Sequence, residues 1–385
     1  VAITVGGFDA TPVAIEGETY YQITLPEGSV QQIAGMPALP DVRRSLIIPD
    51  DREMGITLLE ESHVDLSGYP VAPSKGHLPR TIDPATVPYS FDAFYQSDGI
   101  YPGEAVERHD PYILRDFRGM VADMNAFQYL PGEQTLRVYT RMLVEIAPVG
   151  PGRVNVLERS RPLETMDPAF AQIYASRFLN FADALVHHRY DPVLEEGDLL
   201  IITYDAFLPN IEPLAQWKLQ KGMHTKLVTL SETGSSATQI KAYIQNEFDT
   251  GNLGYVLLIG DYAQMPILSG GSDPLYSLLA GGDSYPDIFV GRFSADNGAQ
   301  VDTQVERTIH YERDVLADEV WPQYGMGVAS NQGPGHYGEY DDEHEDLIRD
   351  DLLAYGYIEV DRIYDPFGTA QMVADGLNTG RGIVN

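Results

Sequence analysis

Residues 199–203 read LLIIT, and comparable short apolar runs follow at 255–260 (YVLLIG), 288–292 (IFVGR) and 325–329 (GMGVA), with RGIVN at 381–385 beginning another. Between the runs lie segments of helical character, at 211–221, 237–248, 299–314 and 343–355. Strands that are apolar on both faces and that alternate with helices are typical of a mostly parallel sheet covered on both sides. The second half of the chain is therefore predicted to be an α/β domain. Ligands are expected in the loops beyond the carboxyl ends of its strands.

The first 150 residues have a different pattern, in which short runs of alternating apolar and polar residues are separated by turns that contain proline and glycine. In LRVYTRMLVEIAP, every second residue from Leu136 to Ile146 falls on one face, and Pro131 and Gly132 supply a turn before this run. We predict an antiparallel, sandwich-like β-rich domain over residues 1–150. Residues 151–189 lack strand periodicity and contain a candidate helix near 168–184, so they are interpreted as a connector.

Composition limits the classes of function. The 385 residues include 25 Lys and Arg against 57 Asp and Glu, a net charge of −32 that repels phosphate backbones, so we expect no nucleic-acid partner. No run approaches the roughly 20 apolar residues that cross a bilayer, so we expect no membrane span. The absence of cysteine excludes disulfides, thiolate metal sites and a cysteine nucleophile within these residues. An acidic chain without cysteine favours a secreted or cell-surface protein of bacterial type, although an acidic cytosolic enzyme would have a similar composition.

Two acidic segments are candidates for binding. The glycine-rich segment 269–287 contains Asp273, Asp283 and Asp287, and oxygen ligands on a bendable loop suit calcium, although the same aspartates could cap turns or face water. The segment EYDDEHED at 339–346 precedes a predicted helix, where the helix dipole favours carboxylates. One of these carboxylates could instead line a pocket for a basic side chain. The chain has no zinc-binding histidine spacing and no G-x-S-x-G motif.

Three longer stretches resemble a known family. They are GYVLLIGDYAQMP at 254–266, DIFVGRFSADNGAQVDTQVERTIHYERD at 287–314 and EHEDLIRDDLLAYGYIEVDRIYDP at 343–366, and they resemble the catalytic domain of the gingipain family of cysteine peptidases (peptidase family C25). The β-rich first part resembles the family's propeptide. The resemblance implies an inhibitory prodomain, a connector with a maturation site, and the amino-terminal part of a caspase-like α/β catalytic domain at 190–385. The catalytic histidine and cysteine are expected beyond Asn385, so no residue of this chain is assigned as catalytic.

The resemblance also implies roles for particular residues. Maturation is expected between Arg189 and Tyr190, and Asp341 takes the position of the carboxylate that binds the substrate arginine. Asp283 and Asp287 match acidic positions near a metal, so calcium is the expected structural cofactor.

In the segment YILRDFRGM, Arg115 and Arg118 are candidates for a prodomain side chain that fills the pocket before activation; the alternative, favoured for such residues, is that they are surface or strand charges. The predicted function is therefore the zymogen portion of a secreted cysteine endopeptidase that cleaves after arginine. Its expected partners are protein or peptide substrates and the remaining part of the catalytic domain. The alternatives are a surface transpeptidase of the same family and a catalytically inactive, calcium-stabilised adhesion module.

Overall fold

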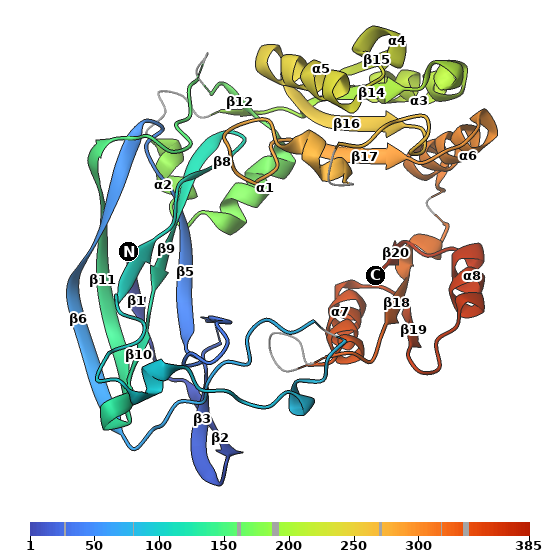
Figure 1. Ribbon diagram of the computed structural model, residues 1–385. Helices are drawn as coiled ribbons and strands as arrows, with labels where there is room; N and C mark the ends of the chain where they lie inside the picture. The colour runs from blue at the N-terminus through green and yellow to red at the C-terminus, as the bar shows by residue number, and fades with distance from the viewer. Residues whose placement is uncertain are drawn as a thin grey trace.

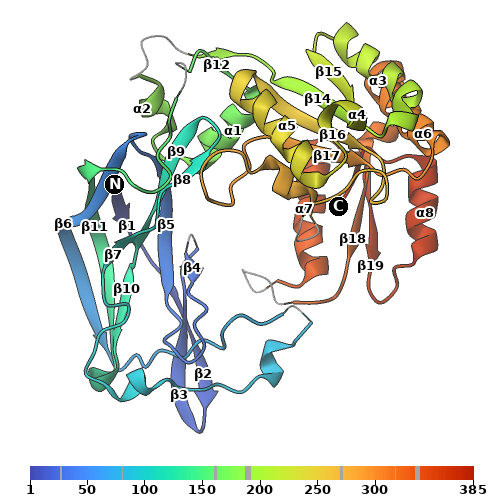
Figure 2. The same cartoon turned by 45° about the horizontal axis from the view of Figure 1, so that its top comes forward.

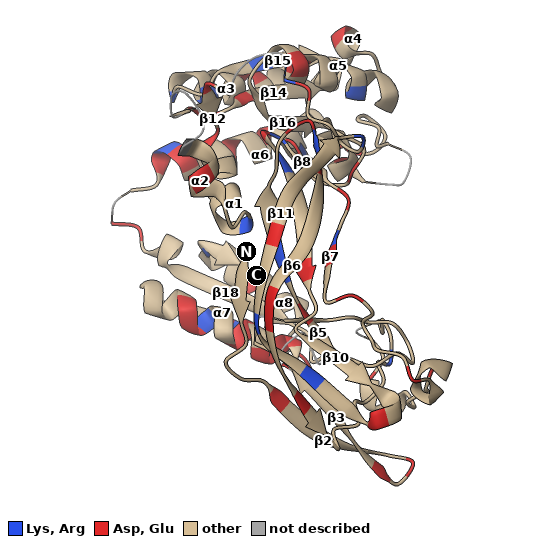
Figure 3. Cartoon of the chain, turned by 90° about the vertical axis from the view of Figure 1, so that its left-hand side faces the viewer, with Lys and Arg blue, Asp and Glu red and all other residues tan. Residues whose placement is uncertain are grey.

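The structure is a computed structural model that describes residues 1–26, 28–79, 81–159, 163–186, 192–268, 272–316, 318–333 and 339–385. Its elements form a β-rich part over residues 1–151 and an α/β part over residues 198–385, joined by a connector that carries two helices (Figure 1). Acidic side chains are spread over both parts (Figure 3). Within the described ranges, no helix has both the length and the apolar character that crossing a membrane requires.

The β-rich part contains two antiparallel sheets and a separate hairpin. The first sheet is formed by β1 (Ala2–Thr4), β6 (Arg52–Ser67), β10 (Phe127–Leu130) and β11 (Thr135–Pro151). The second is formed by β4 (Ser29–Val30), β5 (Pro40–Ile47), β7 (Val106–Arg108), β8 (Tyr112–Leu114) and β9 (Phe117–Met124). The hairpin is β2 (Asp9–Ile15) with β3 (Glu18–Thr24).

The two sheets share one apolar core. The alternation that predicted a strand over 136–146 is confirmed, because Leu136, Met142 and Val144 of β11 are buried and pack in the same cluster as Val42 of β5 and Met124 of β9. Strand β11 pairs with β6 along nearly its whole length, with register shifts at three points. The apolar face of β11, a strand of the first sheet, thus packs against residues of the second sheet, as in an antiparallel sandwich.

The connector contains β12 (Thr165–Met166), α1 (Pro168–Arg177), α2 (Phe181–Val186) and β13 (Val193–Leu194). The carboxylate of Asp167 accepts the N–H groups of Ala169 and Phe170 and so caps α1. The sequence suggested one helix near 168–184, but two form, because Phe178 has extended backbone angles and buries its ring against Phe117 and Tyr174.

The first sheet of the α/β part has the order β15-β14-β16-β17, with every pair parallel. Its strands are β14 (Asp198–Thr203), β15 (Thr225–Thr229), β16 (Leu253–Ile259) and β17 (Phe289–Phe293), and its helices are α3 (Leu208–Gln220), α4 (Leu230–Thr233), α5 (Ala237–Thr250) and α6 (Gly298–Ile309). Side chains of α5 form one core cluster with the sheet, and those of α3 and α6 form another. The predicted parallel sheet, covered on both faces, is therefore confirmed.

The remaining strands form a second sheet instead of extending the first. It has the parallel order β19-β18-β20 and is made of β18 (Tyr324–Ala329), β19 (Glu359–Tyr364) and β20 (Ile383–Val384). Helices α7 (Asp341–Tyr355) and α8 (Ala370–Thr379) lie on its opposite sides (Figures 1 and 2). The sequence predicted one mostly parallel sheet, and the structure corrects this: the strands divide into two parallel sheets, because β18 pairs with β19 and β20 and not with β17.

Candidate functional site

Asp341 is the first residue of α7 and lies just beyond the carboxyl end of β18. The hydroxyl of Ser330, the residue that follows β18, donates a hydrogen bond to Oδ2 of Asp341 at 2.6 Å. The backbone N–H of Asp341 donates to the carbonyl of Gln332 at 2.8 Å. The amino terminus of α7 also favours a negative charge here. This half-buried carboxylate is therefore fixed at the edge of the sheet where α/β proteins commonly bind ligands.

A second carboxylate lies one helical turn further along α7. Glu345 is only 5% exposed, and the side-chain amide of Asn385 donates to its Oε2 at 2.7 Å. Its Oε1 has no hydrogen-bond partner among the described residues. A Cβ atom at position 327 would lie 2.6 Å from Cγ of Glu345, so Gly327 of β18 leaves room for this side chain. Glu345 was not among the site residues predicted from the sequence, although its spacing of four residues from Asp341 places both side chains on the same face of the helix.

Asp287 is fully buried just before β17. Its Oδ2 accepts the N–H groups of Leu279 and Ala280, each at 2.7 Å, and its Oδ1 accepts the N–H group of Arg115 at 2.9 Å. Burial raises the pKa of Asp287 to about 6, while these N–H groups act in the opposite direction. The carboxylate thus organises the loop before β17 and joins it to a residue of the β-rich part.

Asp283 uses its carboxylate in the same way. Its Oδ1 accepts the N–H group of Tyr285 at 2.9 Å, and its Oδ2 accepts the N–H group of Ile113 at 2.8 Å. Asp273, the third acid of this segment, forms a two-pronged ion pair with Arg292, with both N···O distances at 2.7 Å.

These contacts bear on the expected calcium site. Calcium needs several oxygen ligands that face a shared centre. The oxygens of Asp283 and Asp287 instead face backbone N–H groups, and the described residues contain no group of three or more His, Cys, Asp or Glu suited to a metal. The surroundings of these two carboxylates therefore do not fit a cation. Calcium binding by the chain stays a prediction.

Arg118 lies inside the β-rich part. It is 0% exposed, and its guanidinium donates to the carbonyl groups of Pro49, Arg52, Val154 and Asn155 at 2.6–2.9 Å. A side chain held by four carbonyls in its own core cannot also reach a pocket of the α/β part. The expectation that Arg118 fills the pocket is therefore corrected: this arginine ties the β9 strand to the segments around it.

Arg115 does reach the α/β part. Its guanidinium donates to the carbonyl of Leu253 at 2.7 Å and to that of Asp287 at 2.9 Å. Leu253 begins β16, and Asp287 precedes β17, so this contact lies at the amino ends of the strands. Asp341 follows the carboxyl end of β18. The structure thus brings Arg115 to the α/β part without bringing it to Asp341.

The expected maturation site, Arg189 and Tyr190, lies outside the described residues. The segments on either side of it are paired, because the N–H of Val193 donates to the carbonyl of Glu164 at 2.9 Å and the N–H of Glu195 donates to that of Met166 at 3.0 Å. The connector before this site is therefore hydrogen-bonded to the segment after it.

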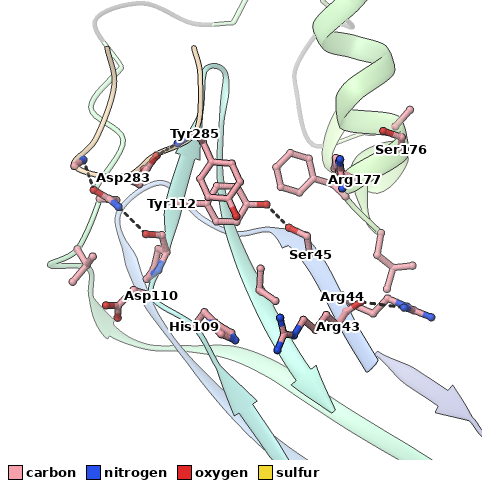
Figure 4. A pocket seen from close by; sticks show the side chains of 18 residues that line it. Arg43, Arg44, Ser45, His109, Asp110, Tyr112, Ser176, Arg177, Asp283 and Tyr285 are labelled. Atoms are coloured by element: carbon pink, nitrogen blue, oxygen red, sulfur yellow. Dashed lines mark hydrogen bonds between the residues drawn. The ribbon is translucent and has the colours of Figure 1, made fainter. Parts of the chain in front are cut away.

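A cavity of about 1190 Å³ lies where the parts meet (Figure 4). Ser45 and Tyr112 of the β-rich part, Arg177 at the end of α1, and Asp283 and Tyr285 of the α/β part contribute to its lining. The rings of Tyr112 and Tyr285 stack with their centroids 4.0 Å apart, and the Tyr112 hydroxyl is hydrogen-bonded to that of Ser45. The walls of the cavity contain both polar and apolar side chains, and they come from segments far apart in the sequence.

Comparison with known proteins defines the class of this chain. The sequence model of peptidase family C25 matches residues 193–385, and that of the family's propeptide, Propeptide_C25, matches residues 5–185. The chain belongs to peptidase family C25, with a propeptide ahead of its peptidase region. The family resemblance drawn from the sequence is confirmed.

Individual relatives are also similar to it. Gingipain R1 of Porphyromonas gingivalis is 33% identical over 373 residues, which cover 94% of this chain but only 37% of that relative. A complex of Porphyromonas gingivalis RgpB pro- and mature domains matches 47% of this chain and 90% of its own, at 30% identity and a TM-score of 0.44. A crystal structure of the Arg-specific cysteine proteinase gingipain R matches 51% of this chain and 48% of its own, at 33% identity and a TM-score of 0.48. The chain thus spans little more than a third of the length of gingipain R1.

Proposed function

We propose that this chain is the zymogen portion of a secreted or cell-surface cysteine endopeptidase that cleaves after arginine. The propeptide and peptidase matches support a prodomain followed by part of a catalytic domain. The α/β part, with its parallel sheets, would be the amino-terminal portion of a caspase-like domain. The thiol nucleophile and its histidine would come from the rest of the catalytic domain, which is the implied partner of these residues.

The position of Asp341 carries the proposal of arginine specificity. Its carboxylate lies beyond the carboxyl end of β18, is half buried, and is oriented by the hydroxyl of Ser330. A carboxylate held in this way can accept two parallel hydrogen bonds from the planar guanidinium of a substrate arginine. The ammonium group of lysine is a point charge and lacks this geometry, so arginine should be preferred.

The same specificity would account for maturation. Cleavage between Arg189 and Tyr190 would place an arginine immediately before the cut bond, as in the proposed substrates. The bond would then be a substrate of the enzyme's own pocket, and one carboxylate would serve both self-processing and digestion. Sequencing the new amino terminus of the complete protein, with and without Arg189→Ala, tests this point.

Asp341→Ala in the complete enzyme is the direct test. Truncating one partner of a buried charge pair costs on the order of 2–5 kcal/mol, so kcat/KM for arginyl substrates should fall roughly 30-fold or more. Asp342→Ala, in the same first turn of α7, is the matched control and should change kcat/KM less than about 3-fold, because it keeps the proposed pocket carboxylate. If the Asp341→Ala enzyme still prefers arginine over lysine, Asp341 only stabilises the amino end of α7.

A further inference from the structure

We propose that the turn formed by residues 112–117, the anchor turn, holds the β-rich part on the α/β part independently of the covalent connector. The receptor for it is the loop 279–287 together with the amino end of β16. This interface is separate from the edge of the sheet that carries Asp341. The inference concerns binding between two parts of this chain and does not depend on the proposed peptidase activity.

Hydrogen bonds from the turn converge on the receptor. The N–H of Ile113 donates to Asp283, and the N–H of Arg115 donates to Asp287, at 2.8 and 2.9 Å. The guanidinium of Arg115 donates to the carbonyls of Leu253 and Asp287 at 2.7 and 2.9 Å. Both backbone N–H groups donate to carboxylates, and hydrogen bonds to ionised acceptors are stronger than those to neutral acceptors. The set is therefore a specific recognition of this turn and not a loose contact.

Burial strengthens the contact of Arg115. Only 7% of its side chain is exposed, and its guanidinium lies 5.0 Å from the ring centre of Phe170 and 5.7 Å from that of Phe248. Phe170 belongs to α1 in the connector, and Phe248 lies near the end of α5. A guanidinium placed against aromatic rings gains further attraction when water is excluded. Loss of this side chain would leave two buried carbonyl groups without their donor.

The shape of the turn is set by contacts from the connector and from the receptor. The hydroxyl of Tyr174 in α1 donates to the carboxylate of Asp116 at 2.8 Å. Arg115 has a φ of 46°, in the left-handed region that few residues other than glycine adopt. A strained residue persists only where its surroundings hold it, and here both its N–H and its guanidinium are bound by the receptor.

Two neighbouring contacts extend the interface. The stacked rings of Tyr112 and Tyr285 join the start of the turn to the receptor loop (Figure 4). The side-chain oxygen of Asn155 accepts the N–H of Gly282 at 2.8 Å, while its amide donates to the carbonyl of Pro111 at 2.8 Å. The Asn155–Gly282 and Tyr112–Tyr285 contacts connect residues 127 and 173 positions apart, on opposite sides of the expected maturation site. Cutting the connector would break none of them.

The test uses the 385-residue chain with residues 187–191 replaced by the recognition sequence of an unrelated site-specific protease. After cutting, size-exclusion chromatography shows whether the two pieces remain together, and surface plasmon resonance gives their dissociation constant. The cut wild-type pieces should co-elute. Arg115→Ala should weaken their binding roughly 30-fold or more, as expected for truncation of a buried, hydrogen-bonded charge.

Two further variants make the result decisive. Tyr285→Ala removes the ring stack from the α/β side and leaves the sequence of the turn unchanged. Weaker binding of this variant would therefore come from the lost contact and not from misfolding of the turn. Arg141→Ala is the matched control, because that arginine pairs with Glu60 on the exposed surface of the β-rich part. The inference is overturned if the wild-type pieces separate on cutting, or if Arg115→Ala and Tyr285→Ala bind as tightly as Arg141→Ala. Asp341→Ala should leave binding unchanged, so a failure of the arginine pocket would not be mistaken for a failure of the anchor.

Discussion

Replacing Asp287 by alanine should destabilise the α/β part strongly, although the residue lies in an irregular loop. The substitution removes the acceptor for the buried N–H groups of Leu279 and Ala280, and it also removes the acceptor for Arg115. The site is fully buried, so water does not reach these donors without rearrangement. The loop before β17 should therefore lose its organising centre.

The magnitude follows from these contacts. An unsatisfied buried N–H group costs about 1–3 kcal/mol, so the donors of Leu279 and Ala280 together suggest about 2–6 kcal/mol. Removing a poorly solvated charge offsets part of this loss, because burial raises the pKa of Asp287 to about 6. We expect a net loss of about 2–4 kcal/mol, which corresponds to a fall in Tm of roughly 5–15 °C for a unit of about 200 residues.

Scanning calorimetry of the 385-residue chain in millimolar calcium and in chelator tests both interpretations of Asp287. If its carboxylate serves the N–H groups, Asp287→Ala should lower Tm by the same amount in both buffers. If it binds calcium, the wild-type Tm should rise with calcium and the variant should lose that response. The reasoning would be refuted if calcium raised the wild-type Tm and Asp287→Ala abolished that rise. It would also be refuted if the Tm of the variant in chelator lay within about 2 °C of the wild-type Tm.

Two arginines should be sensitive to replacement for structural reasons. Arg118→Met leaves four carbonyls without the buried guanidinium that serves them, so calorimetry should show the β-rich part destabilised by about 3 kcal/mol or more. Arg141→Met should change the stability by less than about 0.5 kcal/mol, and equal effects of the two substitutions would contradict this account. Arg292→Lys cannot reproduce the two-pronged contact with Asp273, so urea unfolding should show a loss of about 1–3 kcal/mol, and an unchanged midpoint would show that one ammonium suffices.

The amino-acid sequence alone determined the broad architecture and the family. The alternation from Leu136 to Ile146 predicted strand β11, and the apolar run at 199–203 predicted the buried strand β14. Such patterns can be recognised in a short segment, because the order of apolar and polar residues along it shows which side chains face the core and which face the solvent. The same local signals could not show that β18 would be enclosed by β19 and β20, since strand order is decided by pairing between distant segments.

The roles of the charged residues were decided only by the tertiary structure. Arg115 and Arg118 are three positions apart in one short segment, yet one binds the α/β part and the other is buried in the core of the β-rich part. The acceptor that distinguishes Arg115 is 172 positions away, at Asp287. An ionisable side chain takes its role from the partners that folding brings within hydrogen-bond distance. Those partners are remote in sequence, so composition and spacing identify a charged residue as a candidate but do not determine what it binds.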